Sequence, residues 1–297
     1  MRRRVSHQLP LNGMSSMTDI PKNFNVFWGG GTLSFMNLLT VISFHEHNPD
    51  WKINLFRPKV LKAFSPTFWG TKEQSHKLQC KDHFNDLVNL DFVNEIQLEY
   101  DFLSFGYHHP VIKSDMARYK IMSTYGGIWS DFDIIYINSV DKLINKNNKY
   151  NLFISYDEYH SIGFYIATKN NSFFLKLGAE VEKYKRSKAR DYQYFGRHFV
   201  ENFFEDFESL VSLENCVPFK LSDDIVYPIN FRDLSKITSL DYEEVREHSL
   251  TEDTLGIHWF NGDNSVRQKI DEIDKEYKSD KTLMGYYYNR YEEYINN

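Results

Sequence analysis

The chain has 297 residues, a formal net charge of −6 and a sequence pI near 6.0. Proteins that bind nucleic acid usually carry a basic face or a basic excess, so this balance argues against nucleic acid as a partner. No run of residues approaches the about 18 consecutive apolar residues of a transmembrane helix. The two cysteines, Cys80 and Cys216, are too few for a disulfide framework. They indicate a reducing compartment and therefore a cytoplasmic location.

The first 19 residues contain a positively charged start but lack the apolar segment of a signal peptide. We predict that residues 1–19 are a disordered leader or an expression remnant. The stretch 20–297 shows no internal repeat and no low-complexity linker, which predicts a single domain.

The predicted elements begin with a strand–helix–strand unit. An apolar run over 23–31 ends in three glycines, which is typical of a strand entering a tight turn. Apolar residues at helical spacing over 34–47 predict a helix that an Asn-Pro pair ends, and 51–58 reads as a second strand. A βαβ unit of about 35 residues implies a parallel sheet. Residues 59–100 are less regular, and we expect short helices there.

The second half of the chain continues the alternation of strands and helices. We predict a helix over 109–127, a strand over 128–137, strands over 151–158 and 162–169, helices over 172–188 and 194–210, a short strand or loop over 256–262, and a closing helix with a Tyr-rich side over 282–295. The expected fold class is α/β, with a mixed sheet and a helical accessory region around residues 170–215.

The stretch SDMARYKIMSTYGGIWSDFDIIY, from Ser114 to Tyr136, places charged residues among apolar ones. Asp131 and Asp133 lie two apart in a predicted strand, so both side chains would point the same way. Neighbouring carboxylates repel each other, and a divalent cation such as Mn²⁺ or Mg²⁺ removes the conflict while it also binds phosphate oxygens. A D-x-D spacing alone is a weak signal, but its place after a helix and a Gly-Gly turn favours a metal site.

The preceding helix adds a second charged pair. Asp115 and Arg118 are three residues apart and therefore lie on one helix face. One interpretation is a surface ion pair, which contributes less than about 1 kcal/mol. The other is recognition of a hydroxyl or phosphate group, which the apolar stripe beside Arg118 favours.

The order S-D-x-x-R-Y, Y-G-G-I-W and D-x-D resembles the sugar-nucleotide site of glycosyltransferases that have a DXD motif and a GT-A fold. The opening IPKNFNVFWGGG, followed by NPDWKINLF, is similar to the first signature of the same group, the glycosyltransferase sugar-binding region with DXD. The large clostridial glucosylating toxins are more distant members. The resemblance spans about Ile20 to Phe174 and implies a Rossmann-like, mostly parallel mixed sheet flanked by helices.

For the nucleotide, the resemblance implies that Trp28 stacks on the base. Gly29 and Gly30 would let the main chain approach the nucleotide closely, because glycine has no side chain. The tryptophan is similar to one that stacks on uracil, so the implied donor is a UDP-sugar, although other members of the group use GDP-mannose.

For the charged residues, the resemblance implies four separate roles. Asp115 would contact ribose or donor-sugar hydroxyls, and Arg118 would hold the sugar. Asp131 would contact ribose or a metal-bound water, and Asp133 would bind the metal directly.

The late segment GIHWFNGDN contains further candidates. In related enzymes a late His, Asn or Trp reaches the metal or the diphosphate, which would make His258 a metal ligand and place Trp259 and Asn261 at the nucleotide sugar. Histidine is also a ligand for Mn²⁺ and a hydrogen-bond donor to phosphate. The alternative is a His-Trp pair that packs the C-terminal strand.

The implied function is metal-dependent transfer of a hexose or N-acetylhexosamine from a nucleotide sugar to a glycan or other hydroxyl acceptor. The resemblance also implies retention of the anomeric configuration, and polysaccharide biosynthesis is one setting for such enzymes. Two alternatives stay open: a metal-dependent phosphohydrolase acting on nucleotide sugars, and an inactive carbohydrate-binding protein.

Some weaker candidates have surface interpretations beside their functional ones. The basic run from Lys183 to Arg190 is either a solvated helix face or, with the Tyr-rich tail, a peripheral contact with anionic lipid. The remaining candidates are a possible helix cap at His108 and His109, rim carboxylates at Asp157 and Glu158, and a turn or acceptor contact at Asp223 and Asp224.

Overall fold

The computed structural model describes residues 19–58, 76–98, 110–156, 161–183 and 194–294. The sequence predictions for residues 1–18, for His108 and His109, for Asp157 and Glu158, and for the basic run after Lys183 lie outside the described residues.

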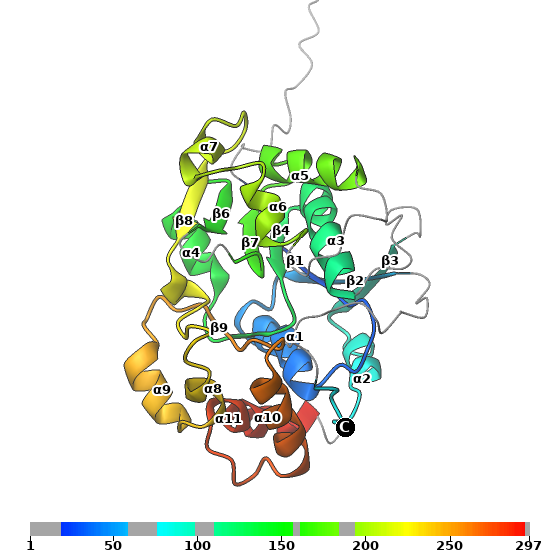
Figure 1. Cartoon of the computed structure of the whole chain (residues 1–297), viewed down its shortest axis with the longest axis vertical. Helices are drawn as coiled ribbons and strands as arrows, with labels where there is room; N and C mark the ends of the chain where they lie inside the picture. The colour runs from blue at the N-terminus through cyan, green and yellow to red at the C-terminus, as the bar shows by residue number, and fades with distance from the viewer. Residues whose placement is uncertain (1–18, 59–75, 99–109, 157–160, 184–193, 295–297) are drawn as a thin grey trace, which may run out of the picture.

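A seven-stranded mixed sheet forms the centre of the fold, and a two-stranded ladder lies beside it (Figure 1). The strands are β1 (Asn23–Phe27), β2 (Lys52–Pro58), β3 (Val93–Leu98), β4 (Gly127–Ser130), β5 (Ile134–Tyr136), β6 (Leu152–Ser155), β7 (Phe164–Ala167), β8 (Pro218–Leu221) and β9 (Gly256–His258). The sheet order is β3-β2-β1-β4-β7-β6-β8, and β5 pairs with β9. Among the described strands of the seven-stranded sheet, β7 alone runs antiparallel to its neighbours. The predicted α/β class with a mostly parallel sheet is confirmed.

Helices cover both faces of this sheet. They are α1 (Phe35–His47), α2 (Phe84–Val88), α3 (Pro110–Tyr125), α4 (Val140–Lys146), α5 (Ser172–Lys183), α6 (Arg197–Glu201), α7 (Phe207–Val211), α8 (Ser235–Thr238), α9 (Tyr242–Ser249), α10 (Asn264–Lys275) and α11 (Leu283–Arg290), with short 3₁₀ turns η2 (Asp223–Ile225) and η3 (Glu292–Tyr294). Figure 1 shows α3, α5 and α6 on one side, and α1 with the C-terminal helices on the other. The strands are therefore covered on both faces, as parallel sheets require.

The alternation of side chains along the strands creates two cores. In β4, Ile128 packs into the cluster that contains α1 and the C-terminal helices, while Trp129 packs into the cluster of α3 and α5. Both side chains are fully buried. Successive residues of a strand point to opposite faces, so a continuous apolar run serves both cores.

The first βαβ unit forms as predicted. Ser34 caps α1 by accepting a hydrogen bond from the Asn37 main-chain N–H, and the Asn37 side chain binds back to the Ser34 main chain. This reciprocal cap satisfies main-chain donors that a helix start leaves unpaired. At the other end, Asn48 accepts hydrogen bonds from Val140 and Ser139, which ties the end of α1 to the start of α4.

Three boundary predictions were wrong. Residues 93–98 form β3 rather than a helix, because every residue of this half-polar edge strand pairs in register with β2. The predicted strand 128–137 is interrupted by a turn at residues 131–133. The predicted helix 194–210 is two short helices, α6 and α7, which are separated by residues 202–206.

The closing helix α11 is confirmed, and its Tyr-rich side faces the protein. Tyr287 and Tyr288 are 3% and 1% exposed and belong to the core around α1. Among the described residues, no helix is long and apolar enough to cross a bilayer.

Candidate active site

The sheet changes direction between β1 and β4. From β1 the chain moves outward to β2 and β3, and then returns through α3 to β4 on the other side of β1. In open parallel sheets, ligands bind beyond the carboxyl ends of the strands at such a switch point. Trp28 follows β1 and Asp131 follows β4, so two of the sequence-predicted residues lie at this edge.

The loop after β1 contacts the D-x-D turn directly. The ring of Trp28 lies edge-on to the ring of Phe132, with 5.3 Å between the ring centroids. Gly30 and Gly31 have φ angles of 111° and 96°, which residues with a Cβ rarely adopt. The two glycines therefore allow a turn that other residues would disfavour. The contact between Trp28 and Phe132 places this turn beside the predicted metal site.

Arg118 is the centre of a buried charge network. Its side chain is 1% exposed, and its Nη2 donates to Asp115 Oδ1 at 2.9 Å and to Asp131 Oδ1 at 3.1 Å. Its Nη1 donates to the Ile162 carbonyl. The guanidinium also lies 5.0 Å from the centroid of the Trp129 ring, and Trp129 Nε1 donates to Asp131 Oδ1 at 2.9 Å. The solvent-exposed ion pair is therefore the wrong interpretation of Asp115 and Arg118.

The exposure of this network increases toward one carboxylate. The Asp115 side chain is 6% exposed, whereas that of Asp131 is 31% exposed. Asp131 is thus the accessible end of a network whose guanidinium is inside the protein. A ligand at the strand edge would meet Asp131 before Arg118.

The pKa values show the cost of this arrangement. Burial raises the pKa of Asp115 to about 7, although Arg118 acts in the opposite direction. Burial also raises the pKa of Asp131, and the charge of nearby Asp133 adds to the increase. For Arg118, burial is outweighed by Asp131 and Asp115, so its pKa is raised and it stays charged. The carboxylates are therefore short of compensating positive charge.

Asp133 is bound by the late segment that the sequence singled out. Its Oδ2 accepts from the Asn261 main-chain N–H at 3.0 Å, and its Oδ1 lies 3.1 Å from His258 Nε2. The Trp259 main-chain N–H donates to the Asp133 carbonyl at 2.8 Å. Burial alone would raise the pKa of Asp133, but His258 and the Asn261 N–H outweigh it and hold the pKa below its ordinary value.

The D-x-D geometry differs from the expected one. Asp131 and Asp133 lie in a turn between β4 and β5, so strand alternation does not place their side chains. The turn directs Asp131 to Arg118 and Asp133 to His258, and the two carboxylates still influence each other's pKa. The predicted strand geometry of the pair is therefore wrong, and their shared role as metal ligands stays a prediction.

Trp259 and Asn261 are placed differently from each other. The Trp259 side chain is 0% exposed and packs in the core, as the packing interpretation of this segment expected. Trp259 therefore contacts the D-x-D turn through its main-chain N–H, which donates to the Asp133 carbonyl. The Oδ1 of Asn261 is buried and has no partner among the described residues. This unpaired oxygen belongs to the residue whose main-chain N–H binds Asp133, and it is a group that a ligand would satisfy.

The donor set suits a hard cation, although the predicted three-ligand set is not assembled. Among the described residues, no three His, Cys, Asp or Glu side chains gather as a metal site. His258 Nε2 instead lies 3.1 Å from Asp133 Oδ1 and pairs with that carboxylate. Two carboxylates and the Asn261 amide oxygen are nevertheless the ligand types that Mg²⁺ and Mn²⁺ prefer.

Gly163 and Tyr227 were not predicted. The Gly163 carbonyl accepts from the Asp131 N–H at 2.8 Å. A Cβ on Gly163 would lie 3.0 Å from the Tyr227 hydroxyl and 3.3 Å from Asp131 Oδ2. The Tyr227 ring lies beside His258, with 5.1 Å between centroids. A glycine at the start of a predicted strand is a signal of close approach, but no local signal singles out Tyr227.

The other predicted carboxylates, Asp223 and Asp224, begin the turn η2 that leads to Tyr227. The turn interpretation is therefore confirmed. Their contact with an acceptor stays a prediction.

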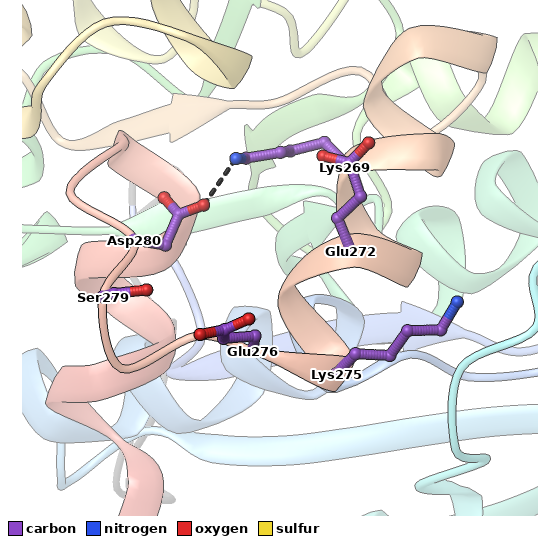
Figure 2. Close-up of a pocket in the computed structure, with 6 residues that line it drawn as sticks. All are labelled: Lys269, Glu272, Lys275, Glu276, Ser279 and Asp280. Atoms are coloured by element: carbon purple, nitrogen blue, oxygen red, sulfur yellow. Dashed lines mark hydrogen bonds and ion pairs between the residues drawn. The ribbon is translucent and has the colours of Figure 1, made fainter.

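Two surface hollows lie away from the D-x-D turn. One, of about 490 Å³, is at the corner of α10 and the segment before α11, where Lys269 pairs with Asp280 (Figure 2). It is lined by Lys269, Glu272, Lys275, Glu276, Ser279 and Asp280. The other, of about 240 Å³, lies between α4 and the segments around β8 and β9. Neither lining includes Asp131 or Asp133.

Residues 38–150 match the family model described as "Glycosyltransferase sugar-binding region containing DXD motif". This part of the chain is similar to that sugar-binding region. The sequence resemblance is confirmed at that level, and with it the expectation of a transferase of the glycosyltransferase type. The match includes Asp115, Arg118, Asp131 and Asp133. It does not include Trp28 or the late segment.

Several solved structures resemble the fold, and no protein of curated function matches the sequence. The PaToxG glycosyltransferase is 17% identical over 64% of this chain and 70% of that chain, with a TM-score of 0.43. The glycosyltransferase GlyE of Streptococcus pneumoniae TIGR4 is 12% identical over 92% of this chain and 64% of its own, with a TM-score of 0.44. The galactosyltransferase LgtC, solved with donor and acceptor sugar analogs, is 11% identical over 85% of this chain and 95% of that chain, with a TM-score of 0.39. These likenesses are too distant to assign residues or substrates.

Proposed function

We propose that this chain transfers a hexose or N-acetylhexosamine from a nucleotide sugar to a hydroxyl acceptor, with a divalent cation as cofactor. One observation supports this most strongly. Within the matched DXD region, Asp131 and Asp133 lie together at the switch point of the sheet, and separate partners, Arg118 and His258, hold them.

The proposed donor is a UDP-sugar. Trp28 is half-buried at the carboxyl end of β1, beside the D-x-D turn. An aromatic ring in that position offers a stacking surface for a planar base. The choice of uracil rests on the sequence resemblance of Trp28, and GDP-sugars are the comparison in the test below.

The proposed cofactor is Mn²⁺ or Mg²⁺, held by Asp133 and Asp131. When bound, such a cation stabilises the negative charge that develops on the departing diphosphate. Asn261 Oδ1 is a further oxygen donor beside Asp133. His258 keeps the Asp133 carboxylate ionised and oriented, and it becomes a ligand itself only if its ring leaves Asp133.

The charged residues of α3 orient the donor in this proposal. Arg118 fixes Asp131 through Oδ1, and the partly exposed Asp131 carboxylate meets ribose or a cation-bound water. The Asp115 side chain is buried, so its contact with donor hydroxyls requires the sugar to reach the base of the site. The closed packing around Arg118 excludes water, which strengthens electrostatic interactions there.

For the reaction itself we propose retention of configuration. The acceptor hydroxyl attacks the anomeric carbon from the face that the diphosphate leaves. The carbon–oxygen bond to the acceptor forms as the bond to the diphosphate breaks, and the hydroxyl proton passes to a phosphate oxygen. No covalent intermediate on a carboxylate is part of this proposal, so a trapped glycosyl–enzyme adduct would contradict it.

The test is a thermal-shift panel of UDP- and GDP-sugars with and without Mn²⁺, followed by product analysis with sugar acceptors. A ligand at 100 times its dissociation constant adds about 2.7 kcal/mol of stability. We expect a UDP-sugar with Mn²⁺ to raise the melting temperature, and Asp133→Asn to abolish the increase. Asp224→Asn, an exposed carboxylate near the site, is the matched control and should keep it.

The outcomes separate the candidate functions. A glycosylated acceptor, with the anomeric configuration read by NMR, supports transfer and decides retention. Hydrolysis of the donor that no acceptor redirects indicates a phosphohydrolase. A metal-dependent shift without turnover indicates a carbohydrate-binding protein. Unchanged turnover in Asp133→Asn would overturn the assignment of the metal ligand.

A further inference from the structure

One face of α10 holds the main chain of residues 76–81. Asn264 Oδ1 accepts from His76 N at 2.9 Å, and Arg267 Nε donates to His76 O at 2.8 Å. Asp271 Oδ1 accepts from Gln79 N at 2.8 Å and from Cys80 N at 3.0 Å. Asp274 Oδ2 accepts from Lys81 N at 3.1 Å. These four α10 side chains are spaced three, four and three residues apart, so they form one stripe along the helix. We call residues 76–81 the tethered segment.

Arg267 contacts the late segment as well as the tethered segment. Its Nη1 donates to the Asn261 carbonyl at 3.3 Å. The N–H of the same residue, Asn261, donates to Asp133 Oδ2 at 3.0 Å. Asn261 is therefore held from both sides, by a carboxylate of the D-x-D turn and by the guanidinium.

The main chain next to Asn261 is in an unfavourable conformation. Phe260 has a φ of 56°, in the left-handed region that residues with a Cβ seldom occupy. Such a conformation costs about 1–3 kcal/mol and persists only where the surroundings determine it. The hydrogen bonds of Trp259 N and Asn261 N to Asp133, of Asp263 N to Phe260 O, and of Arg267 to Asn261 O hold the main chain around it.

We propose that Arg267 is a positioning residue of the transfer site: it anchors Asn261 to the tethered segment and so fixes the amide that orients Asp133. The proposal rests on the proposed metal-dependent function. A guanidinium suits this role because its planar fork donates to two carbonyls at fixed angles, whereas a lysine ammonium donates as a point charge. Partners that orient a metal-binding carboxylate typically change metal affinity or activity 10–100-fold when they are removed.

The experiment compares Arg267→Gln and Arg267→Lys with Lys269→Gln. Lys269 lies two residues further along α10, which places it on a different face of the helix from Arg267, and it pairs with Asp280 (Figure 2). The control therefore removes a charged contact of the same helix without touching Asn261. Two quantities are measured on the full chain: hydrogen–deuterium exchange of the 256–263 peptide without metal, and the Mn²⁺ concentration that gives half of the UDP-dependent thermal shift.

We expect Arg267→Gln to speed exchange at the Asn261 amide and to raise the half-saturating Mn²⁺ concentration by about 10-fold or more. Arg267→Lys, which keeps the charge and reaches one carbonyl, should fall between Arg267→Gln and the wild type. Lys269→Gln should leave both quantities unchanged, even where it lowers the melting temperature. If Arg267→Gln does not fold, the same comparison is made with Arg267→Lys.

The negative results are distinguishable. If the wild type responds to Mn²⁺ and UDP but the Arg267 variants respond equally, with unchanged exchange at Asn261, the positioning role is overturned and the proposed function stands. If the wild type shows no response to Mn²⁺ or nucleotide, the proposed function and the positioning role both fail.

Discussion

The substitution Arg118→Met tests whether the buried charge network is held by the guanidinium. Methionine is similar in length but has no charge and no donors. Without Arg118, Asp131 loses one of its hydrogen-bond donors and the 4%-exposed Asp115 loses its charged partner. Removing one partner of a buried ion pair typically costs about 3–5 kcal/mol. We expect a loss of this size in the free energy of unfolding at pH 8.

The loss should depend on pH in a defined direction. Arg118 lowers the pKa of both Asp115 and Asp131, so removing it raises both pKa values further. A carboxyl group whose pKa is higher in the folded than in the unfolded state makes folding less favourable as the pH rises between the two values. For Asp115 the interval already runs from 3.8 to about 7, which corresponds to about 4 kcal/mol. The variant should therefore lose less stability at pH 5, where protons replace the missing guanidinium, than at pH 8.

The assay is urea unfolding, followed by tryptophan fluorescence at pH 5 and pH 8 without metal or nucleotide. Arg246→Met is the matched control, because Arg246 pairs with Glu243 at the same three-residue spacing on α9 but both side chains are more than 60% exposed. Exposed pairs of this kind contribute less than about 1 kcal/mol. A loss for Arg118→Met no larger than that of the control at pH 8, or a loss that is larger at pH 5 than at pH 8, would refute the reasoning.

Two glycine substitutions test other parts of the site and its support. Gly163→Ala places a Cβ 3.0 Å from the Tyr227 hydroxyl and 3.3 Å from Asp131 Oδ2. We therefore expect the half-saturating Mn²⁺ concentration in the UDP-dependent thermal shift to rise by about 10-fold. An unchanged Mn²⁺ titration would contradict this. Gly127→Ala places a Cβ 2.2 Å from a main-chain oxygen at a φ of 89°, so it should cost more than about 3 kcal/mol in urea unfolding. Gly31→Ala, with a φ of 96° but nothing within 4 Å, is its control and should cost only about 1–2 kcal/mol for the backbone conformation.

The βαβ unit and α3 could be predicted because their signals are local. Ser34 and Asn48 mark the two ends of α1, and Gly126, with a φ of 61°, ends α3 as expected. The D-x-D pair and the Asp115–Arg118 pair lie within 19 residues of each other, so their proximity follows from one helix, one turn and one strand. Helix ends, turns and pairs of this kind can be recognised from a short stretch of sequence alone.

What could not be predicted depends on contacts between distant segments. Residues 93–98 have a half-polar pattern, and they form a strand because β2 offers a complete row of partners. The D-x-D turn departs from strand geometry because Arg118 and the segment around His258 bind its two carboxylates from different sides. Tyr227 follows the predicted turn at Asp223 and Asp224, and Arg267 lies on a helix that the sequence analysis did not predict, so nothing local to either residue indicates its contact with the site.

The charges of the site favour joint binding of a cation and a diphosphate. The site holds three carboxylates and one guanidinium: Arg118 pairs with Asp115 and Asp131, while Asp133 pairs with the His258 ring, which offers at most one further positive charge. When all three acids are ionised, the site therefore has excess negative charge and would repel a diphosphate. A divalent cation offsets that negative charge and removes the repulsion between Asp131 and Asp133. Burial of these carboxylates disfavours their ionised form when no ligand is bound. The same buried charges couple cation binding to nucleotide binding, because each ligand supplies the charge that the other requires.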